Sequence, residues 1–356
     1  MKKFALQNKG ISLGIISALL FGILLLVPAI ADVIYRRGLF QLVRIFFDYS
    51  LNLLPFSSAL VVVPLAMFFA VRYLVHRTFS LVSIVLGILN IAGFLLFAFF
   101  CAWGFNYSCP TLVSKATFST APLSVEELYS FGQDVNQHAS VLRTSLREEA
   151  PPLSANTENE VRECLEQVLQ EMHIPTLGRV RCRVLDENGI MRQLGVAGIY
   201  FPFSGEGLTN STYLPPTLLF IMAHEMSHGY GITNEGEADL CAYIALAGSK
   251  DSFFRYAAEL ELLRNIRGRL KNEDFDRYQL LRAQADTLVD SDLRAIFRNG
   301  LAYQEYFPGM QEKMNNSYLK LLGIKEGTGS YDAFIELVFQ SRQARWPVPR
   351  EIWVDD

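Results

Sequence analysis

Three long apolar segments near the N-terminus constrain this chain more than any other feature. Residues 11–31 and 81–104 contain no charged side chain, and each is long enough to cross a hydrocarbon core about 30 Å thick as a helix. The apolar segment between them, residues 53–71, is long enough only if its first residues join the helix. The sequence therefore predicts a transmembrane region over residues 1–104, with helices at about 11–31, 53–71 and 81–104 in a lipid bilayer.

A cleaved signal peptide is an alternative for the first of these segments. Ala29, Ile30 and Ala31 resemble the small-residue site at which signal peptides are cut, and basic residues precede the segment. Its apolar stretch is longer than the core of about 7–15 residues found in signal peptides. This length favours a helix that is retained.

Basic residues beside the apolar segments predict their orientation. Lys2, Lys3 and Lys9 precede the first segment, and Arg72 and Arg77 lie between the second and third. The positive-inside rule places both regions in the cytoplasm, although three arginines in the remaining loop oppose this orientation. We therefore expect a multi-pass protein of the inner cell membrane in which residues 105–356 form an extracytoplasmic domain.

The remainder of the chain has the pattern of a mostly helical domain with a small β-sheet. Helical spacing begins after Ser124 and at Thr157, whereas β-forming residues cluster between Gly178 and Leu214. The expected fold class is mainly α (α+β). The net charge of −4 includes no basic patch, so the sequence gives no support for a nucleic-acid partner.

The segment HEMSH contains two of the five histidines in the chain, His224 and His228. It lies in a segment predicted to be helical, so residues four apart share one face and both imidazoles can bind one ion. Glu225 is then placed beside the ion, where it can take a proton from water. The sequence predicts a Zn²⁺ site with Glu225 as the catalytic residue.

A catalytic zinc ion usually has three protein ligands, so a third ligand is expected nearby. Glu235 and Glu237 both follow the glycine-rich turn after His228, at the start of another predicted helix. Glu235 shares a helix face with Asp239, whereas Glu237 points elsewhere. We therefore expect Glu235 to bind the metal, Asp239 to orient a histidine ligand from behind, and Glu237 to have a structural role.

Simpler interpretations of these residues exist. Acidic residues are common in the first turn of a helix because they complement its dipole, and a buried histidine is usually a core residue. A zinc ion could also stabilise a binding or assembly protein without catalysis, but such a site would need no Glu225. A zinc amidase acting on cell-envelope material is a further alternative.

HEMSH followed by NEGEAD resembles the gluzincin metallopeptidases, whose second helix supplies a glutamate ligand and an outer aspartate. The resemblance implies zinc at His224, His228 and Glu235, with Glu225 as general base and Asp239 behind the site. The interval from His228 to Glu235 is much shorter than in thermolysin-like enzymes. The predicted domain is therefore zincin-like, with peptides or proteins of the cell envelope as substrates.

Further segments resemble a bacterial membrane family catalogued as a domain of unknown function and regarded as zinc-binding peptidases. These are the three N-terminal apolar segments, WGFNY, GIYFPFSGEGLTNSTYLPP and NNSYLKLLGIKEGTGSY. An oxyanion-stabilising donor is also expected, and Tyr200, Tyr213 and Tyr230 remain open candidates. The segment GIYFPFSGEGLTNSTY could instead form an edge strand that lines the cleft, where a peptide substrate would add by backbone hydrogen bonds.

Overall fold

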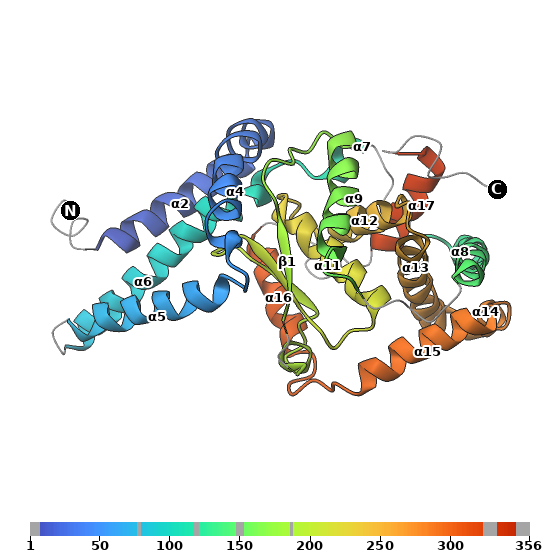
Figure 1. The fold of residues 1–356 in the computed structure, drawn as a ribbon. Coiled ribbons are helices and arrows are strands. Elements are labelled where there is room, and N and C mark those ends of the chain that lie inside the picture. Colours follow the sequence, from blue (N-terminus) through green and yellow to red (C-terminus); the bar gives the residue numbers. More distant parts are fainter. Residues whose placement is uncertain are drawn as a thin grey trace. The chain divides into compact units, whose positions relative to one another are not determined.

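The computed structural model of the chain is mainly helical, with a small mixed sheet of three strands, which confirms the predicted fold class (Figure 1). It describes residues 8–76, 80–116, 121–146, 153–185, 188–322 and 333–346. The chain divides into two compact units. Unit 1 contains Met1–Pro110, Leu177–Arg181 and Tyr200–Glu206, and unit 2 contains the rest. The sequence predicts a boundary after Gly104, and it does not indicate that two later segments join unit 1.

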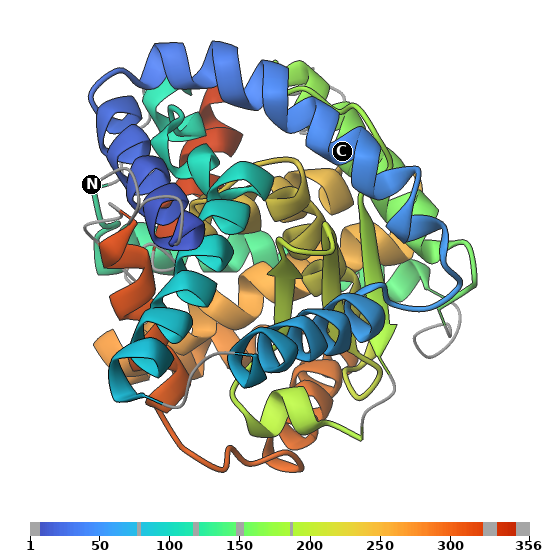
Figure 2. The ribbon, with the colours of Figure 1, turned by 90° about the vertical axis from the view of Figure 1, so that its left-hand side faces the viewer.

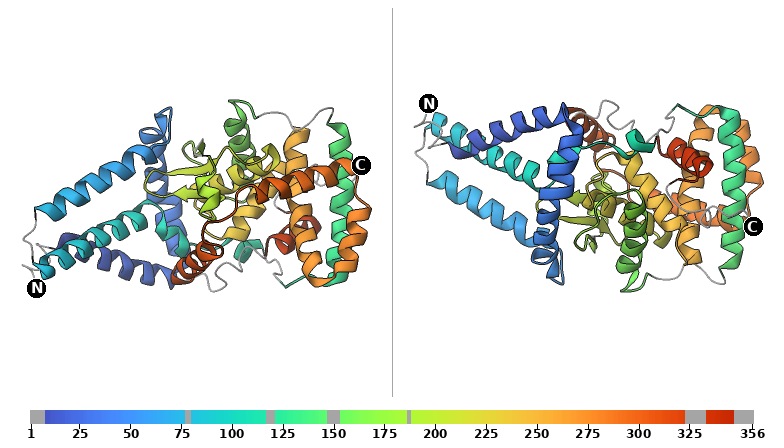
Figure 3. Two further views of the ribbon diagram at one scale, coloured as in Figure 1. Left: turned by 90° about the horizontal axis from the view of Figure 1, so that it is seen from below. Right: turned by 90° about the horizontal axis from the view of Figure 1, so that it is seen from above.

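Unit 1 is built from helices of very different lengths. Figure 3 shows its helix α2 lying beside α6, with the segment after α2 crossing the end of this pair. The elements in chain order are α2 (Lys9–Leu25), α3 (Pro28–Ala31), η1 (Asp32–Leu39), α4 (Phe40–Asp48), η2 (Leu51–Leu53), α5 (Ala59–Val75), α6 (Leu81–Ala102) and η3 (Gly104–Ser108).

One described helix, α6, is long and apolar enough by itself to cross a membrane. The segments Lys9–Leu25 and Pro28–Leu53 pass the same test only if they are counted as one span bent by 119°. Helix α5 is shorter, and at 17 residues it measures about 25 Å, less than a hydrocarbon core of about 30 Å. The described residues therefore contain one or two candidate membrane-spanning helices instead of the three expected.

The first predicted helix, residues 11–31, is interrupted in the structure. Helix α2 ends at Leu25, and Val27 has φ −135° and ψ 60°, outside the helical region. The α conformation is disfavoured for a residue that precedes a proline. Val27 therefore leaves the helical region, and Pro28 begins a new helix. The second predicted helix, residues 53–71, also differs from the structure, in which α5 begins at Ala59 and ends at Val75.

The orientation of these helices remains a prediction. Three of the basic residues that support it, Lys2, Lys3 and Arg77, lie outside the described residues.

Helix α5 contains no buried residue within unit 1, although it is almost entirely apolar. Exposure of so much apolar surface is unusual for a helix surrounded by water and is expected for one surrounded by lipid.

Helices α2 and α6 approach each other through glycine residues. A Cβ atom added at Gly14 would lie 2.8 Å from the Cα atom of Gly93, and one added at Gly93 would lie 2.3 Å from the Gly10 carbonyl oxygen. Asn90 on α6 also accepts a hydrogen bond from the Gly10 amide at 2.7 Å. Small residues at such contacts let helix backbones pack closely within membranes.

We expect Gly93→Leu to destabilise the full chain, because its side chain would force α2 and α6 apart. Overpacking of this kind costs at least about 1–3 kcal/mol. The melting temperature of the detergent-solubilised protein measures the effect. Gly22→Leu is the matched control, since a Cβ there would meet no atom within 4 Å. Equal melting temperatures for the two variants would contradict the close packing.

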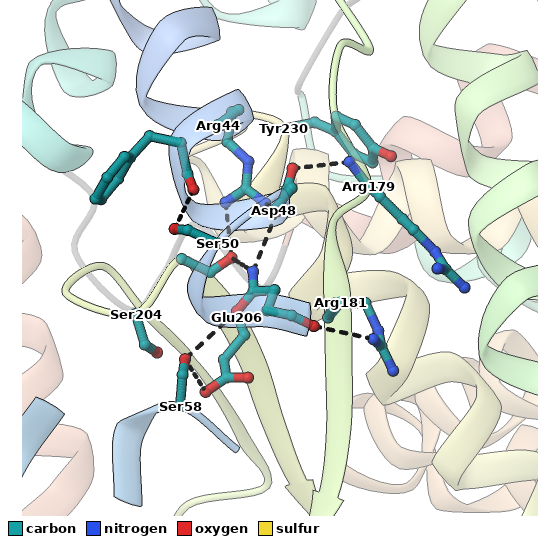
Figure 4. A network of polar contacts seen from close by, with 12 residues as sticks. Arg44, Asp48, Ser50, Ser58, Arg179, Arg181, Ser204, Glu206 and Tyr230 are labelled. Carbon is teal, nitrogen blue, oxygen red and sulfur yellow. Dashed lines mark hydrogen bonds and ion pairs between the residues drawn. The ribbon is translucent and has the colours of Figure 1, made fainter. Parts of the chain in front are cut away.

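A buried ion pair on α4 connects that helix to the two later segments of unit 1 (Figure 4). Arg44 pairs with Asp48 and donates hydrogen bonds to the Tyr200 hydroxyl at 2.9 Å and the Gly205 carbonyl at 2.7 Å. The second carboxylate oxygen of Asp48 accepts the Arg179 amide at 2.8 Å. Because a buried charge needs such partners, residues 177–181 and 200–206 are held firmly within unit 1.

Glu206 makes a second set of contacts in unit 1. Its Oε1 atom accepts hydrogen bonds from the Ser57 hydroxyl at 2.7 Å, the Ser58 hydroxyl at 3.1 Å and the Ala59 amide at 3.0 Å. These residues precede and begin α5, and an acidic group at the N-terminus of a helix is stabilised by the helix dipole. Glu206 therefore connects a strand of the sheet to the start of α5.

Unit 2 contains the remaining helices of the described residues (Figure 1). In chain order these are α7 (Leu112–Ala116), α8 (Val125–Ser145), α9 (Thr157–Glu171), α10 (Ile190–Gln193), α11 (Pro215–Gly229), α12 (Glu235–Ala247), α13 (Ser252–Glu273), α14 (Phe275–Ala283), α15 (Thr287–Leu301), α16 (Met310–Leu321) and α17 (Phe334–Ala344). Helix α12 is almost completely buried and contacts α9, α11, α13 and α17.

The sheet consists of β1 (Arg181–Leu185), β2 (Gly198–Phe201) and β3 (Glu206–Asn210), in the order β1-β3-β2. Figure 2 shows its strands in yellow-green. Strand β3 is central and buried along its whole length, whereas β1 and β2 form the two edges. The sequence predicts a small sheet from the β-forming residues between Gly178 and Leu214, and the three strands lie within that range.

Candidate metal centre

Helix α11 presents both histidines of the HEMSH segment on one face. Its first turn contains two prolines, which are compatible with that position because their missing amides would have no helical partner. The Nε2 atoms of His224 and His228 lie 3.1 Å apart. The one-turn spacing in the sequence therefore produces two imidazoles that converge on one point.

The glycine-rich turn brings a carboxylate to the same point. Gly231 has φ +90°, which favours glycine, and the chain reverses before Asn234 caps α12 by accepting the Glu237 amide. Glu235 is the first residue of α12, and its Oε2 atom lies 3.2 Å from Nε2 of each histidine. The turn thus converts three residues of one short segment into a compact cluster.

The three nearest atoms form an almost equilateral triangle, with sides of 3.1, 3.2 and 3.2 Å. Ligand atoms about 2.0–2.1 Å from a tetrahedral zinc ion lie about 3.3 Å apart. Nitrogen and carboxylate oxygen are also common zinc ligands. His224, His228 and Glu235 therefore form a group that could hold a metal ion in zincin-like geometry.

Both imidazoles are oriented by partners on their other nitrogen atom. Nδ1 of His224 lies 2.6 Å from an oxygen of Asp239, and Nδ1 of His228 lies 2.7 Å from the Ile232 carbonyl oxygen. A carbonyl can only accept, so Nδ1 of His228 donates, and a carboxylate favours the same state of His224. In the neutral imidazoles, each Nε2 atom is then left with a lone pair directed at the centre of the group.

The charge of the ion-free group also favours a cation. Burial lowers the pKa of His224, but Asp239 and Glu235 outweigh burial and raise that pKa well above its usual value. Burial raises the pKa of Glu235, but the two imidazoles reverse this and lower it. Three carboxylates, those of Glu225, Glu235 and Asp239, surround two imidazoles, so a divalent cation would relieve their mutual repulsion.

Glu225 is buried, and its carboxylate packs against the sheet. A Cβ atom added at Gly198 in β2 would lie 2.5 Å from its Oε1 atom, and one added at Gly207 in β3 would lie 2.8 Å from its Cβ atom. Its Oε2 atom has no hydrogen-bond partner within the described part of the chain. Burial raises the pKa of Glu225 to about 7, although both imidazoles oppose this rise.

Glu237 and two of the tyrosines considered as oxyanion-stabilising donors make contacts with residues outside the metal-binding group. Glu237 accepts the Val113 amide at 2.8 Å and is not part of the metal-binding group. The Tyr230 hydroxyl donates to Glu166 at 2.5 Å, and the Tyr213 ring lies 4.1 Å from the Arg192 guanidinium. The third tyrosine considered as an oxyanion-stabilising donor, at position 200, belongs to unit 1.

Several residues around the group are not indicated by the sequence pattern. The Ile232 carbonyl offers no side-chain signal, because any residue could supply it. Gly198 and Gly207 do offer one, since glycine inside a predicted strand often marks a place where another group approaches closely. Neither glycine is among the site residues predicted from the sequence.

We expect Asp239→Asn to weaken zinc binding by about 10–100-fold, the usual effect of losing an outer carboxylate on a histidine ligand. The asparagine side chain can still accept the His224 hydrogen bond, but it lacks the charge that makes the imidazole a stronger ligand. Competition with a fluorescent zinc chelator measures the change. Asp276→Asn, at an exposed position on α14, is the control for net charge. Unchanged affinity in Asp239→Asn would argue against this role.

Comparison with known proteins gives one result. Residues 35–339 match the model of a family described as a protein of unknown function, DUF3810. No curated protein and no solved structure matches the chain.

Proposed function

Since the chain belongs to the DUF3810 family, whose function is unknown, we propose its activity from the site alone: it is a zinc metallopeptidase anchored in a membrane. The observation that most supports this proposal is the position of Glu225. Its unpartnered carboxylate oxygen is buried close to the three side chains that could hold a metal ion. A zinc site with a purely structural role would need no such carboxylate.

The number of ligands also favours catalysis over a structural role. Among the described residues, the group contains three side chains that could bind the ion, whereas structural zinc sites usually have four. A fourth position remains for water or substrate in such a site. The number of protein ligands to the zinc ion, which can be measured, therefore distinguishes the proposed peptidase from a metal-stabilised assembly protein.

Bound zinc would supply a Lewis acid that acidifies water and polarises a carbonyl group. In the proposed mechanism, Glu225 accepts the proton of the attacking water and passes it to the leaving amine. Asp239 and the Ile232 carbonyl hold the two imidazoles in the tautomer that directs Nε2 to the ion. Gly198 and Gly207 leave the space that the side chain of Glu225 occupies, Gly198 beside the carboxylate and Gly207 beside the Cβ atom.

The edge position of β2 supports a peptide as substrate. Its first residue, Gly198, lies against Glu225, and β2 has a neighbouring strand on one side only. An extended peptide could pair with this edge through backbone hydrogen bonds, which would place its carbonyl groups near Glu225. We propose peptides or proteins of the cell envelope as substrates, with the site on the extracytoplasmic side of the inner membrane.

The proposal can be tested with the purified full chain in nanodiscs. We expect about one zinc ion per chain, cleavage of members of a peptide library, and loss of cleavage after chelation that is reversed by added zinc. Cleavage of cell-wall fragments but not of peptides would support a zinc amidase instead. Bound zinc without hydrolysis of either substrate class would contradict the enzyme and favour the assembly protein.

A further inference from the structure

A cavity of about 700 Å³ lies in unit 2, where the end of α14 meets α15. Its lining contains three arginines, one from α14 and two from α15, and a single carboxylate. The charged residues are Arg282, Asp290, Arg294 and Arg298. None of them belongs to the metal-binding group or to the proposed catalytic residues.

The spacing of α15 produces this concentration of charge. Asp290, Arg294 and Arg298 occur at intervals of four residues, so they lie on one face of the helix. Asp290 accepts hydrogen bonds from Nε of Arg282 at 3.2 Å and from Nε of Arg294 at 2.7 Å. It also accepts one from the buried Arg267 at 3.2 Å.

The charge of one carboxylate cannot neutralise the charges of three guanidinium groups. Three arginines that line the cavity face a single aspartate, on a chain whose net charge is −4. Each guanidinium has five N–H donors, and Asp290 takes only a part of those of Arg294. Arg298 donates through Nε to the Arg294 carbonyl, so the rest of its donors are left for another acceptor.

The neutral lining of the cavity also suits an anion. Thr287 and Ser291 contribute hydroxyl groups, and both residues are exposed. Phe297 lies at the same cavity with 66% of its surface exposed. Arginines beside hydroxyl groups are typical of phosphate recognition, because the planar guanidinium fits phosphate oxygens in pairs.

We propose that this cavity binds a phosphate group, carried either by a soluble phosphate or by the headgroup of an anionic lipid. The two sources share the chemistry that Arg294 and Arg298 recognise. The exposed Phe297 ring is a group that the lipid source would use, since aromatic side chains insert at membrane surfaces beside basic residues. The site is independent of the proposed peptidase activity.

The test uses the full chain in detergent, titrated calorimetrically with inorganic phosphate and analysed by native mass spectrometry with phosphatidylglycerol or phosphatidylcholine. Arg294→Gln/Arg298→Gln should weaken binding by at least about tenfold. The matched control is Lys271→Gln/Lys313→Gln, which removes the same charge from exposed positions elsewhere and should change affinity less than about twofold.

The outcomes separate the two sources and the alternatives. Binding of phosphate alone identifies a soluble ligand, whereas selective retention of phosphatidylglycerol over phosphatidylcholine identifies a headgroup. Failure of the wild-type protein to bind either compound, or equal losses in the two double variants, would overturn the proposal. If the arginine double variant does not fold, Arg298→Gln gives the same comparison, because Arg298 bonds only to a backbone carbonyl among the described residues.

Discussion

Glu225→Gln is expected to bind as much zinc as the wild-type protein and to lower kcat/KM for peptide cleavage by about 10²–10⁴-fold. The glutamine side chain has nearly the same shape, so it fits the space beside Gly198 and Gly207. It cannot accept a proton from water at neutral pH. Glu225 is not one of the three side chains that could hold the metal ion, so its replacement should leave the zinc ion bound.

The control for this variant is Glu237→Gln, which changes the same residue type on the next helix, α12. Its side chain bonds to the Val113 amide, a contact that the glutamine oxygen can also make. We expect its activity to stay close to that of the wild type. Full activity in Glu225→Gln, with zinc retained, would show that Glu225 is not the base and would contradict the proposed mechanism.

The second large effect is expected for His224→Ala, which should lose stoichiometric zinc and all zinc-dependent activity. Removing His224 leaves His228 and Glu235 as ligands, and two protein ligands rarely retain zinc. The zinc affinity of His224→Ala should therefore fall further than that of Asp239→Asn, for which we expect a loss of about 10–100-fold. Metal content after dialysis, measured by mass spectrometry, gives the result.

His138→Ala is the corresponding control, because His138 is an exposed residue of α8 that does not belong to the metal-binding group. Its zinc content should equal that of the wild type. Stoichiometric zinc in both variants would mean that the ion binds elsewhere, and the site would have to be abandoned. A wild-type protein without zinc would lead to the same conclusion.

The arrangement of the residues that could hold a metal ion could be predicted from the sequence where it depends on one short segment. His224 and His228 share a face because any α-helix brings residues four apart together, and Pro215 and Gly229 indicate where that helix begins and ends. Helical geometry also separates Glu235 from Glu237. The structure brings Glu235 to the two histidines and connects Glu237 to Val113.

The remaining features depend on contacts between distant parts of the chain. The spacing of Gly198 and Gly207 does not reveal that both lie against Glu225, because strand order is not a local property. The inclusion of residues 177–181 and 200–206 in unit 1 depends on the buried partners of Arg44 and Asp48. The interruption before Pro28 is a local feature, but the uninterrupted apolar composition of residues 11–31 predicts one continuous helix.

The contacts of Glu206 have a practical consequence for anyone who wishes to work with a soluble version of this protein. Glu206 bonds to Ser57, Ser58 and Ala59, while its immediate neighbour Gly207 leaves room for Glu225. A fragment expressed from Thr111 onward would lack Ser57, Ser58 and Ala59, the three donors to Oε1 of Glu206. Such a fragment would expose a buried carboxylate one residue from the strand position that faces the proposed base. An inactive soluble fragment would therefore be poor evidence against enzymatic activity of the whole chain.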